Sequence, residues 1–329
     1  MMYGFGLGWA WGGLSIALTL VSFSLLVHSI FMISARRTIY LYRRIIIVVP
    51  LSLWIIYYCF NNYINDRGLE GLVWWFILIF FMVVLNPRVI KKSNRTVVLL
   101  SLLSLFFDAI IRFMSVDLDS ILNNYYVVKQ NAIFGVDSNV SGVVCVVTGC
   151  LLVLAKPKFS KLSYFLHMVA LGLLTILTLS KAAVISLFIL LIYVFSYRLF
   201  LLVVILVLLT SPLIITGFES GLTKFQILYE FKEYLIEASG RELLLGFGVN
   251  NFIFSEIDLN PHVLLVQLVV YFGFIGSLLY FTFWVCLFVY CRRRLMVFLV
   301  PYTFLSLSFT PIMLPIMCYL ILTMIASEE

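Results

Sequence analysis

Apolar runs long enough to cross a membrane follow one another through most of this 329-residue chain. A helix that spans a bilayer needs roughly 17–25 mostly apolar residues, at about 1.5 Å per residue. This requirement predicts about eleven spanning helices, over residues 7–33, 45–60, 69–86, 96–112, 140–155, 162–179, 182–197, 199–216, 263–291, 295–309 and 311–326. The sequence therefore predicts an all-α fold, in which a polytopic transmembrane helix bundle of residues 1–329 forms a single integral membrane domain.

The composition supports this fold class. Hydrophobic residues make up 64% of the chain and charged residues 11%, whereas soluble domains contain roughly 45–50% and 25%. All six cysteines fall inside apolar runs, so the sequence predicts no disulfide framework, no metal site and no cofactor. The first apolar run lacks a charged leading segment and a small-residue cleavage site, which predicts a retained helix rather than a cleaved signal peptide.

Basic residues concentrate in short segments that alternate with loops poor in lysine and arginine. Fifteen of the 22 lysines and arginines lie within residues 36–44, 88–95, 156–161 and 292–294 and at residue 198. Since cytoplasmic loops carry an excess of these residues, we expect the N-terminus outside and the C-terminus inside. The net charge of +7 then fits an anionic inner leaflet. No basic and aromatic residues interleave outside the apolar runs, which excludes nucleic acid as a partner.

The longest polar segment, residues 217–261, predicts one large loop on the outer side. Within it, apolar residues recur at spacings of three and four: Leu222, Phe225, Leu228, Phe231, Leu235 and Ala238. This periodicity predicts an amphipathic helix that lies in the outer membrane–water interface. Thr223 with Gln226 fits a capping box at its start, and Gly240 fits a stop signal at its end. The first half of the chain has no loop of this length, which counts against an inverted-repeat transporter.

A few polar residues interrupt or border the apolar runs. Asp108 and Arg112 are four residues apart in one predicted helix, so we expect an intrahelical ion pair. Lys181 lies at the junction of two predicted helices, where it either snorkels to the interface or contacts an anion. Residues Asp137-Ser138-Asn139 precede a predicted helix and either cap it or bind a ligand. His262 lies at a helix entrance beside the large loop, and we expect a functional role for it.

Glycines recur in two places near that loop. Gly246 and Gly248 lack the strand and the further glycine or lysine that a nucleotide-binding loop requires, so they predict a tight turn. Gly273 and Gly276 are one helical turn apart, and we expect them to let another helix approach closely.

Four elements in this order give the chain a resemblance to a known family. They are Gly135-Val136-Asp137-Ser138-Asn139 before a helix, Leu177-Thr178-Leu179-Ser180-Lys181-Ala182-Ala183 between two helices, Leu245-Gly246-Phe247-Gly248-x-Asn250-Asn251-Phe252 late in the loop, and His262 followed by Gly273-x-x-Gly276. Together they resemble the O-antigen polymerase and O-antigen ligase superfamily of bacterial inner membranes. The resemblance spans roughly residues 130–290, and the earlier helices match only in being apolar.

The resemblance implies an enzyme that transfers glycans from undecaprenyl diphosphate to an acceptor hydroxyl on the periplasmic face, without a metal. Cations must then neutralise the lipid diphosphate leaving group, and the candidates are Lys181, Arg241, Lys224 and Lys232. The family usually has arginine where Lys181 stands, and a lysine offers a point charge rather than a bidentate fork.

An acceptor hydroxyl needs a group that takes its proton or orients it, and the resemblance gives this role to His262. The residue after it is Val263, where the family often has Asn or Ser, so a second polar partner such as Asn251 must come from elsewhere. Asp137 and Asn139 are candidate contacts for sugar hydroxyls.

We therefore expect an O-antigen or related surface polysaccharide polymerase of the bacterial inner membrane, with its active site facing the periplasm and inverting glycosyl transfer as its reaction. Its expected partners are the lipid-linked donor and acceptor, membrane lipids, a chain-length regulator and a flippase. One alternative is an O-antigen ligase that transfers glycan to the lipid A core. The other is a lipid-linked oligosaccharide flippase or transporter that does no chemistry.

Overall fold

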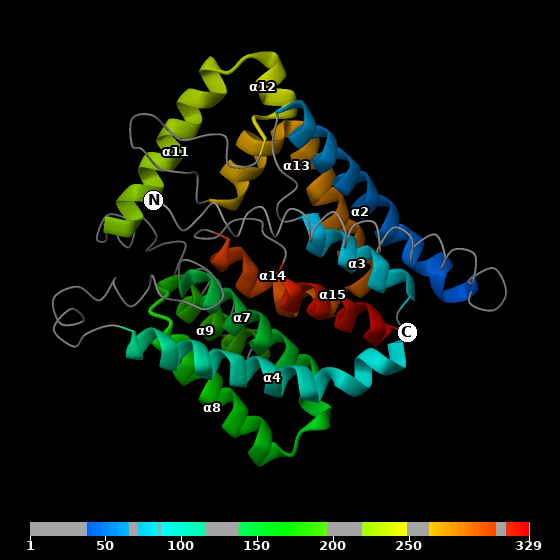
Figure 1. The fold of residues 1–329 in the computed structure, drawn as a ribbon, viewed down its shortest axis with the longest axis vertical. Coiled ribbons are helices and arrows are strands. Elements are labelled where there is room, and N and C mark those ends of the chain that lie inside the picture. The colour runs from blue at the N-terminus through cyan, green and yellow to red at the C-terminus, as the bar shows by residue number, and fades with distance from the viewer. Residues whose placement is uncertain are drawn as a thin grey trace.

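The chain folds into helices throughout the segments that the structure, a computed structural model, describes: residues 38–65, 72–84, 87–115, 138–195, 219–248, 263–306 and 314–328. These segments contain eleven α-helices, one 3₁₀ helix and no strand (Figure 1). The elements are α2 (Thr38–Ile64), α3 (Leu72–Val84), α4 (Pro87–Met114), α7 (Ser138–Leu154), η1 (Lys156–Lys158), α8 (Lys161–Leu177), α9 (Lys181–Phe195), α11 (Glu219–Glu237), α12 (Gly240–Leu245), α13 (Leu264–Cys291), α14 (Arg293–Leu305) and α15 (Pro315–Glu328). The predicted all-α class is confirmed for these segments.

The helices coincide with the predicted apolar runs and extend some of them. α2 and α4 each begin several residues earlier than predicted, because lysine and arginine are good helix formers and a helix need not end where its apolar run ends. Within the described segments, three helices are long and apolar enough to cross a membrane: Arg44–Ile64, Pro87–Met114 and Leu264–Cys291. This length and composition mark a membrane protein. The helices expected over residues 7–33 and 199–216 lie outside the described residues.

The basic segments gather at one end of the helices. The Arg95 guanidinium lies 5.8 Å from the ring centre of Phe159, next to η1. Partial desolvation and the neighbouring Lys91 ammonium lower the pKa of the largely exposed Lys158. The start of α14 and the end of α15 are joined by an ion pair between Arg294 and Glu328, 3.2 Å apart. We call the region that these segments form the basic end.

The opposite end contains three pairs of helix termini that contact each other. The end of α4 contacts the end of α8 through Arg112 and Leu177, and the start of α9 contacts the start of α7 through Ser180 and Asn139. The amide of Leu264, at the start of α13, donates to the carbonyl of Ser306 at the end of α14, at 3.0 Å.

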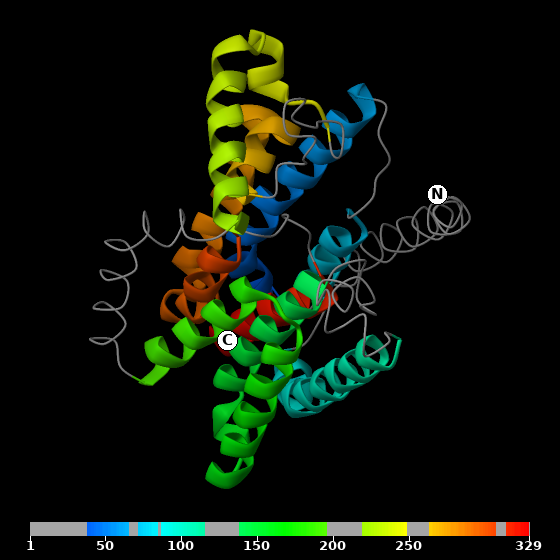
Figure 2. The ribbon, with the colours of Figure 1, turned by 90° about the vertical axis from the view of Figure 1, so that its left-hand side faces the viewer.

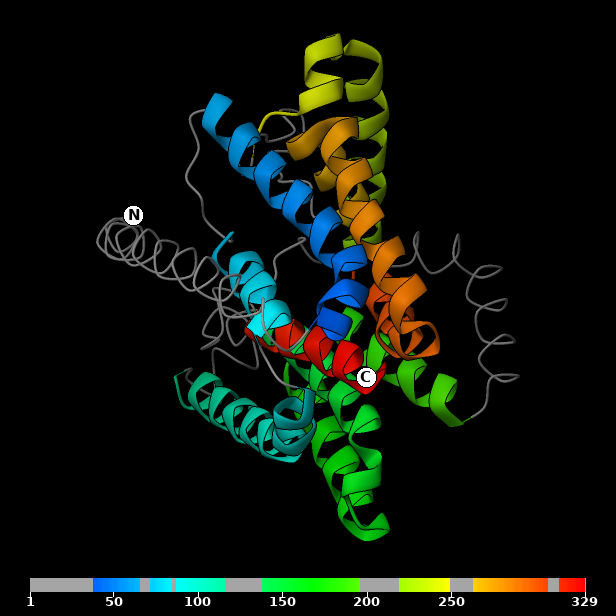
Figure 3. The same ribbon diagram turned by 90° about the vertical axis from the view of Figure 1, so that its right-hand side faces the viewer.

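The described part of the polar segment, residues 219–248, contains two helices, α11 and α12, which lie away from α4 and α8 (Figure 2 and Figure 3). α12 lies against α13 and the end of α2. The predicted helix is present as α11, but its buried face is not the predicted one: Ile227 and Tyr234 are buried, whereas Phe225, Leu228 and Leu235 of the predicted apolar face are exposed. The start predicted at Thr223 is wrong, since α11 begins at Glu219. A glutamate in the first turn favours a helix N-terminus, and Thr223 lies inside the helix.

The stop predicted at Gly240 is also wrong, because Gly240 is the first residue of α12. The hydroxyl of Ser239 accepts from the amide of Glu242 at 3.3 Å, and the Glu242 carboxylate accepts from the amide of Ser239 at 2.7 Å. This reciprocal capping box satisfies two amides at the start of the new helix. α11 therefore ends because a second helix begins, and the glycine does not end it.

Candidate functional site

The structure describes only some of the predicted site residues. His262, Asp137 and Asn251 lie outside the described residues, and Lys224 lies in α11 without a described side chain. Asn139, Lys181, Lys232 and Arg241 remain to be placed. They fall into two separate regions, one at the start of α7 and α9 and the other on α11 and α12.

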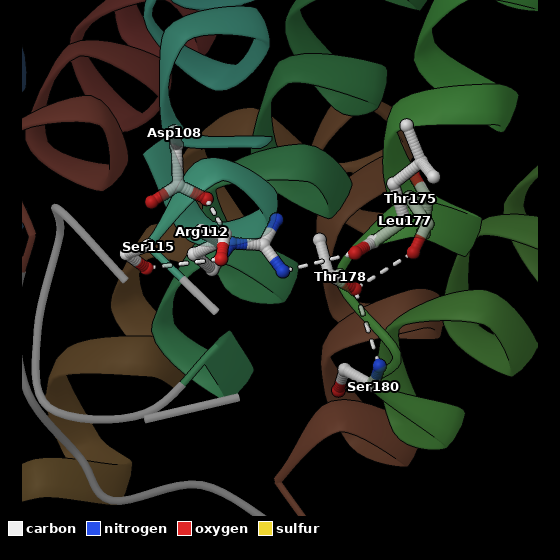
Figure 4. Close-up of polar contacts among 7 residues, drawn as sticks. All are labelled: Asp108, Arg112, Ser115, Thr175, Leu177, Thr178 and Ser180. Atoms are coloured by element: carbon white, nitrogen blue, oxygen red, sulfur yellow. Dashed lines mark hydrogen bonds and ion pairs between the residues drawn. The ribbon is translucent and has the colours of Figure 1, made fainter. Parts of the chain in front are cut away.

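A tight turn between α8 and α9 carries Lys181. The Thr178 hydroxyl donates to the carbonyl of Thr175 at 2.7 Å and accepts from the amide of Ser180 at 3.2 Å (Figure 4). Leu179 has a φ of +56°, a left-handed conformation that is uncommon for a residue with a side chain. Lys181, the first residue of α9, is exposed to solvent or lipid. Local hydroxyl contacts thus shape the turn from which the Lys181 side chain emerges.

Asn139 and Ser180 join α7 to this turn. The Ser180 hydroxyl donates to the Asn139 side-chain carbonyl at 2.8 Å. The two helices approach closely there, since a Cβ built on Gly142 would lie 2.7 Å from the Cβ of Ala183. Two of the sequence elements behind the family resemblance, separated by about 40 residues, are therefore neighbours in space. Lys181 follows Ser180 directly and lies at the same junction.

A buried ion pair lies behind the turn. Arg112 Nε and Asp108 Oδ2 are 2.9 Å apart, with side chains 1% and 0% exposed, which confirms the predicted intrahelical pair. Arg112 Nη1 also donates to the carbonyl of Leu177 at 2.9 Å (Figure 4). Charges removed from water must be paired and hydrogen-bonded, and both requirements are met here. Arg112 therefore links α4 to the last turn of α8.

The other candidate cations lie elsewhere. Arg241 is exposed on α12, and Figure 1 shows α12 at the far side of the molecule from α9. Lys232 is 68% exposed on α11, with its Nζ 3.7 Å from a carboxylate oxygen of Glu233 and 5.8 Å from the ring centre of Tyr229. The structure therefore does not bring Arg241 or Lys232 together with Lys181.

The glycine segment after α12 is a tight turn, as predicted. Gly246 and Gly248 have φ values of +76° and +80°. The amides of Phe247 and Gly248 donate to the carbonyls of Val270 and Tyr271, each at 2.9 Å. The turn therefore uses its amides to pair with the backbone of α13.

α13 is broken where that turn docks. Gly273 has a φ of +62° and a ψ of −172° inside the helix, and a Cβ on it would overlap the backbone of Leu244. Gly276 faces α2, since a Cβ there would lie 2.5 Å from the ring of Tyr57. Close packing at both glycines is thus confirmed. The prediction of a continuous helix through residue 273 is wrong, because the end of α12 occupies the space that a regular turn would need.

Sequence reasoning missed the side chains that complete this break. Tyr57 donates its hydroxyl to the carbonyls of Phe272 at 2.7 Å and Leu245 at 3.1 Å, and Asn61 donates to the same Leu245 carbonyl. Tyr57 and Asn61 are four residues apart on α2 and therefore share a face. The available signal was Asn61-Asn62 inside an apolar run, because polar groups at membrane depth need partners.

Comparison with known proteins adds no identification. The chain matches no protein-family model, no curated protein and no solved structure. Among the residues with a described placement, no three His, Cys, Asp or Glu side chains gather as metal ligands.

Proposed function

We propose that this protein is a polysaccharide polymerase of the bacterial inner membrane, which joins repeat units carried on undecaprenyl diphosphate. The observation that carries the proposal is the junction of Asn139, Ser180 and Lys181, which unites two family-like elements at the end of the helices opposite the basic end. With basic segments on the cytoplasmic side, this junction faces the periplasm. The helices form a polytopic bundle of about eleven spans, and residues 217–261 form its large periplasmic loop.

Lys181 and the residues around it are placed to bind the leaving group, which is the lipid diphosphate. A lipid diphosphate carries about two negative charges that must be neutralised as the bond to the sugar breaks. Lys181 supplies a cation as the first residue of α9, where the helix dipole also favours an anion. Arg241 and Lys232 lie on a different part of the molecule, so they serve the approach of donor or acceptor rather than this contact.

The sequence resemblance gives His262 the role of accepting the proton of the acceptor hydroxyl. The acceptor oxygen forms a bond to the anomeric carbon, the bond from that carbon to the phosphate oxygen breaks, and the diphosphate leaves with the electron pair. The acceptor proton passes to the neutral imidazole of His262. Attack opposite the leaving group inverts the configuration of that carbon.

Replacing His262 or Lys181 in a strain that makes long-chain polysaccharide tests the proposal. Each variant is expressed in a strain that lacks the chromosomal gene, and the glycan ladder is read on a silver-stained gel. We expect His262→Ala to abolish the ladder and Lys181→Ala to shorten it, whereas Lys181→Arg keeps the cation and the ladder. Lys158→Ala, an exposed cation at the basic end, is the matched control and should leave the ladder intact.

The same strains separate this function from its alternatives. A polymerase deletion leaves a single repeat unit on the lipid A core, whereas a ligase deletion leaves none. A flippase or transporter deletion leaves no lipid-linked donor on the periplasmic face. A full ladder from both His262→Ala and Lys181→Ala, at normal protein levels, would remove these residues from the reaction.

A further inference from the structure

We propose that Arg112, held by Asp108, is the positioning residue of the diphosphate contact, because it fixes the turn that presents Lys181. This inference rests on the proposed function and adds a residue to it. Arg112 lies on α4, outside the four sequence elements that suggested the site. Arg112 is connected to Lys181 through the backbone of the α8–α9 turn.

Arg112 contacts the last residue of α8. Leu177 is the last residue of that helix, and the last four carbonyls of a helix lack intrahelical donors. The Leu177 carbonyl receives its hydrogen bond from Arg112 Nη1 at 2.9 Å. A cation at a helix C-terminus is also favoured by the helix dipole. Arg112 therefore fixes the point at which α8 ends.

A strained turn follows the end of α8. Leu179, two residues beyond Leu177, is held at a φ of +56°, and such a conformation persists only where the surrounding structure determines it. Arg112 holds the turn on one side, and the hydrogen bond from Ser180 to Asn139 at 2.8 Å holds it on the other. Lys181 directly follows the second contact. Loosening the Arg112 contact frees one side of the turn and shifts the Lys181 ammonium.

Burial of Arg112 and Asp108 allows them to position Lys181 but not to contact the substrate. Arg112 is 1% exposed and Asp108 is 0% exposed, so neither side chain can touch a lipid-linked substrate at the surface. Asp108 also offsets the charge of Arg112, so the cation that the junction presents outward is that of Lys181. Arg112 therefore acts on the donor only through Lys181.

A double-mutant cycle in the full-length protein in nanodiscs tests this coupling. The assay follows chain growth from lipid-linked repeat units extracted from the deletion strain, and gives KM and kcat separately. We expect Lys181→Ala and Arg112→Gln each to raise KM for the donor on the order of tenfold, as for loss of one charge-assisted hydrogen bond. The variant with both changes should be no worse than Lys181→Ala alone. Arg112→Lys, which keeps a charged donor, should recover part of the loss.

Additive effects of Arg112→Gln and Lys181→Ala would overturn the inference, as would a fall in kcat and in folded protein with KM unchanged. If Arg112→Gln does not fold, the pair Asp108→Leu with Arg112→Met removes both charges and still removes the anchor. That double variant should show the same rise in KM. A normal KM in a folded protein that lacks the pair would likewise overturn it.

Binding of farnesyl diphosphate distinguishes failure of this inference from failure of the proposed function. If the wild-type protein extends no glycan but binds the probe, the polymerase proposal fails, and coupling is tested by whether Arg112→Gln weakens binding only when Lys181 is present. If the wild-type protein extends glycans and Arg112→Gln leaves both KM and probe binding unchanged, only the inference fails. A wild-type protein that neither extends glycans nor binds the probe overturns both.

Discussion

Two of the interruptions of the helical backbone satisfy their free carbonyls by different means. Between α8 and α9, the carbonyl of Leu177 is satisfied by the charged side chain of Arg112. At the break in α13, the carbonyls of Val270 and Tyr271 are satisfied by backbone amides of the turn after α12. The first interruption is completed by a charged side chain, and the second by close backbone approach at glycines together with the side chains of Tyr57 and Asn61 on α2. Only the first leaves a cation, Lys181, facing outward.

Because of this difference, the α8–α9 turn is suited to chemistry, whereas the break in α13 is suited to helix packing. A turn held by side chains can present a further side chain at a defined position, because the holding contacts lie behind it. The turn after α12 uses its own amides to pair with α13, and Gly246 and Gly248 carry no side chains. Hence Gly246 and Gly248, although they belong to a family-like element, are expected to fix the shape of the protein rather than to bind substrate.

The largest predicted effect is that of Gly273→Ala. The added methyl would overlap the Leu244 backbone, and the residue would have to keep a φ of +62°, so we expect a destabilisation above about 4 kcal/mol. Gly172→Ala is the control, because a Cβ there meets nothing within 4 Å. The measurement is the amount of monodisperse protein and its melting temperature in detergent. Equal melting temperatures for the two variants would show that the break in α13 does not depend on this close approach.

A smaller effect is predicted for breaking the buried ion pair. Asp108→Leu leaves the Arg112 charge buried and unpaired, which costs about 3–5 kcal/mol. Adding Arg112→Met should recover most of that stability, since an apolar pair of similar volume can replace a buried ion pair. Thermal unfolding in nanodiscs measures both variants. Recovered stability without recovered glycan chain growth would separate the role of the pair in positioning Lys181 from its role in folding.

The smallest effect is predicted for alkaline pH on the packing of α11. Burial, with a further contribution from Glu242, raises the pKa of Tyr234 from 10.0 to about 12. Because the folded-state pKa lies above the unfolded one, the stabilisation is complete below pH of about 10 and is lost as the pH rises toward about 12. Melting temperatures measured at pH 9 and pH 11 should fall less for Tyr234→Phe than for the wild-type chain. Tyr229→Phe, on the exposed face of α11, should behave as the wild-type chain does.

The features that the sequence predicted correctly are those that local spacing determines. Apolar runs located the helices, and the four-residue spacing of Asp108 and Arg112 predicted their ion pair. Periodicity also predicted that residues 222–238 are helical, although the face it marked as apolar is the exposed one. The capping box of Ser239 and Glu242 had the same kind of local signal, a serine three residues before a glutamate, although Gly240 was interpreted instead as a stop.

The remaining features depend on contacts between distant parts of the chain. Arg112 and Leu177 are 65 residues apart, and no local pattern pairs a guanidinium with one particular carbonyl. The break at Gly273 was equally hidden, because a glycine inside a helix costs only about 1 kcal/mol and also fits close packing. Its left-handed φ follows from the position of α12, which the sequence alone does not give.

α4 is longer than the hydrocarbon core of a bilayer is thick, and its length determines how deep the buried ion pair lies. α4 has 28 residues and is therefore about 42 Å long, whereas the hydrocarbon core of a bilayer is about 30 Å thick. If Arg95 marks one boundary of that core, Asp108 lies about 20 Å beyond it, well inside the opposite boundary. An ion pair at that depth favours a locally thinned leaflet or penetrating water. We therefore expect the acyl-chain length of the surrounding lipid to govern how readily a diphosphate at headgroup level reaches Lys181.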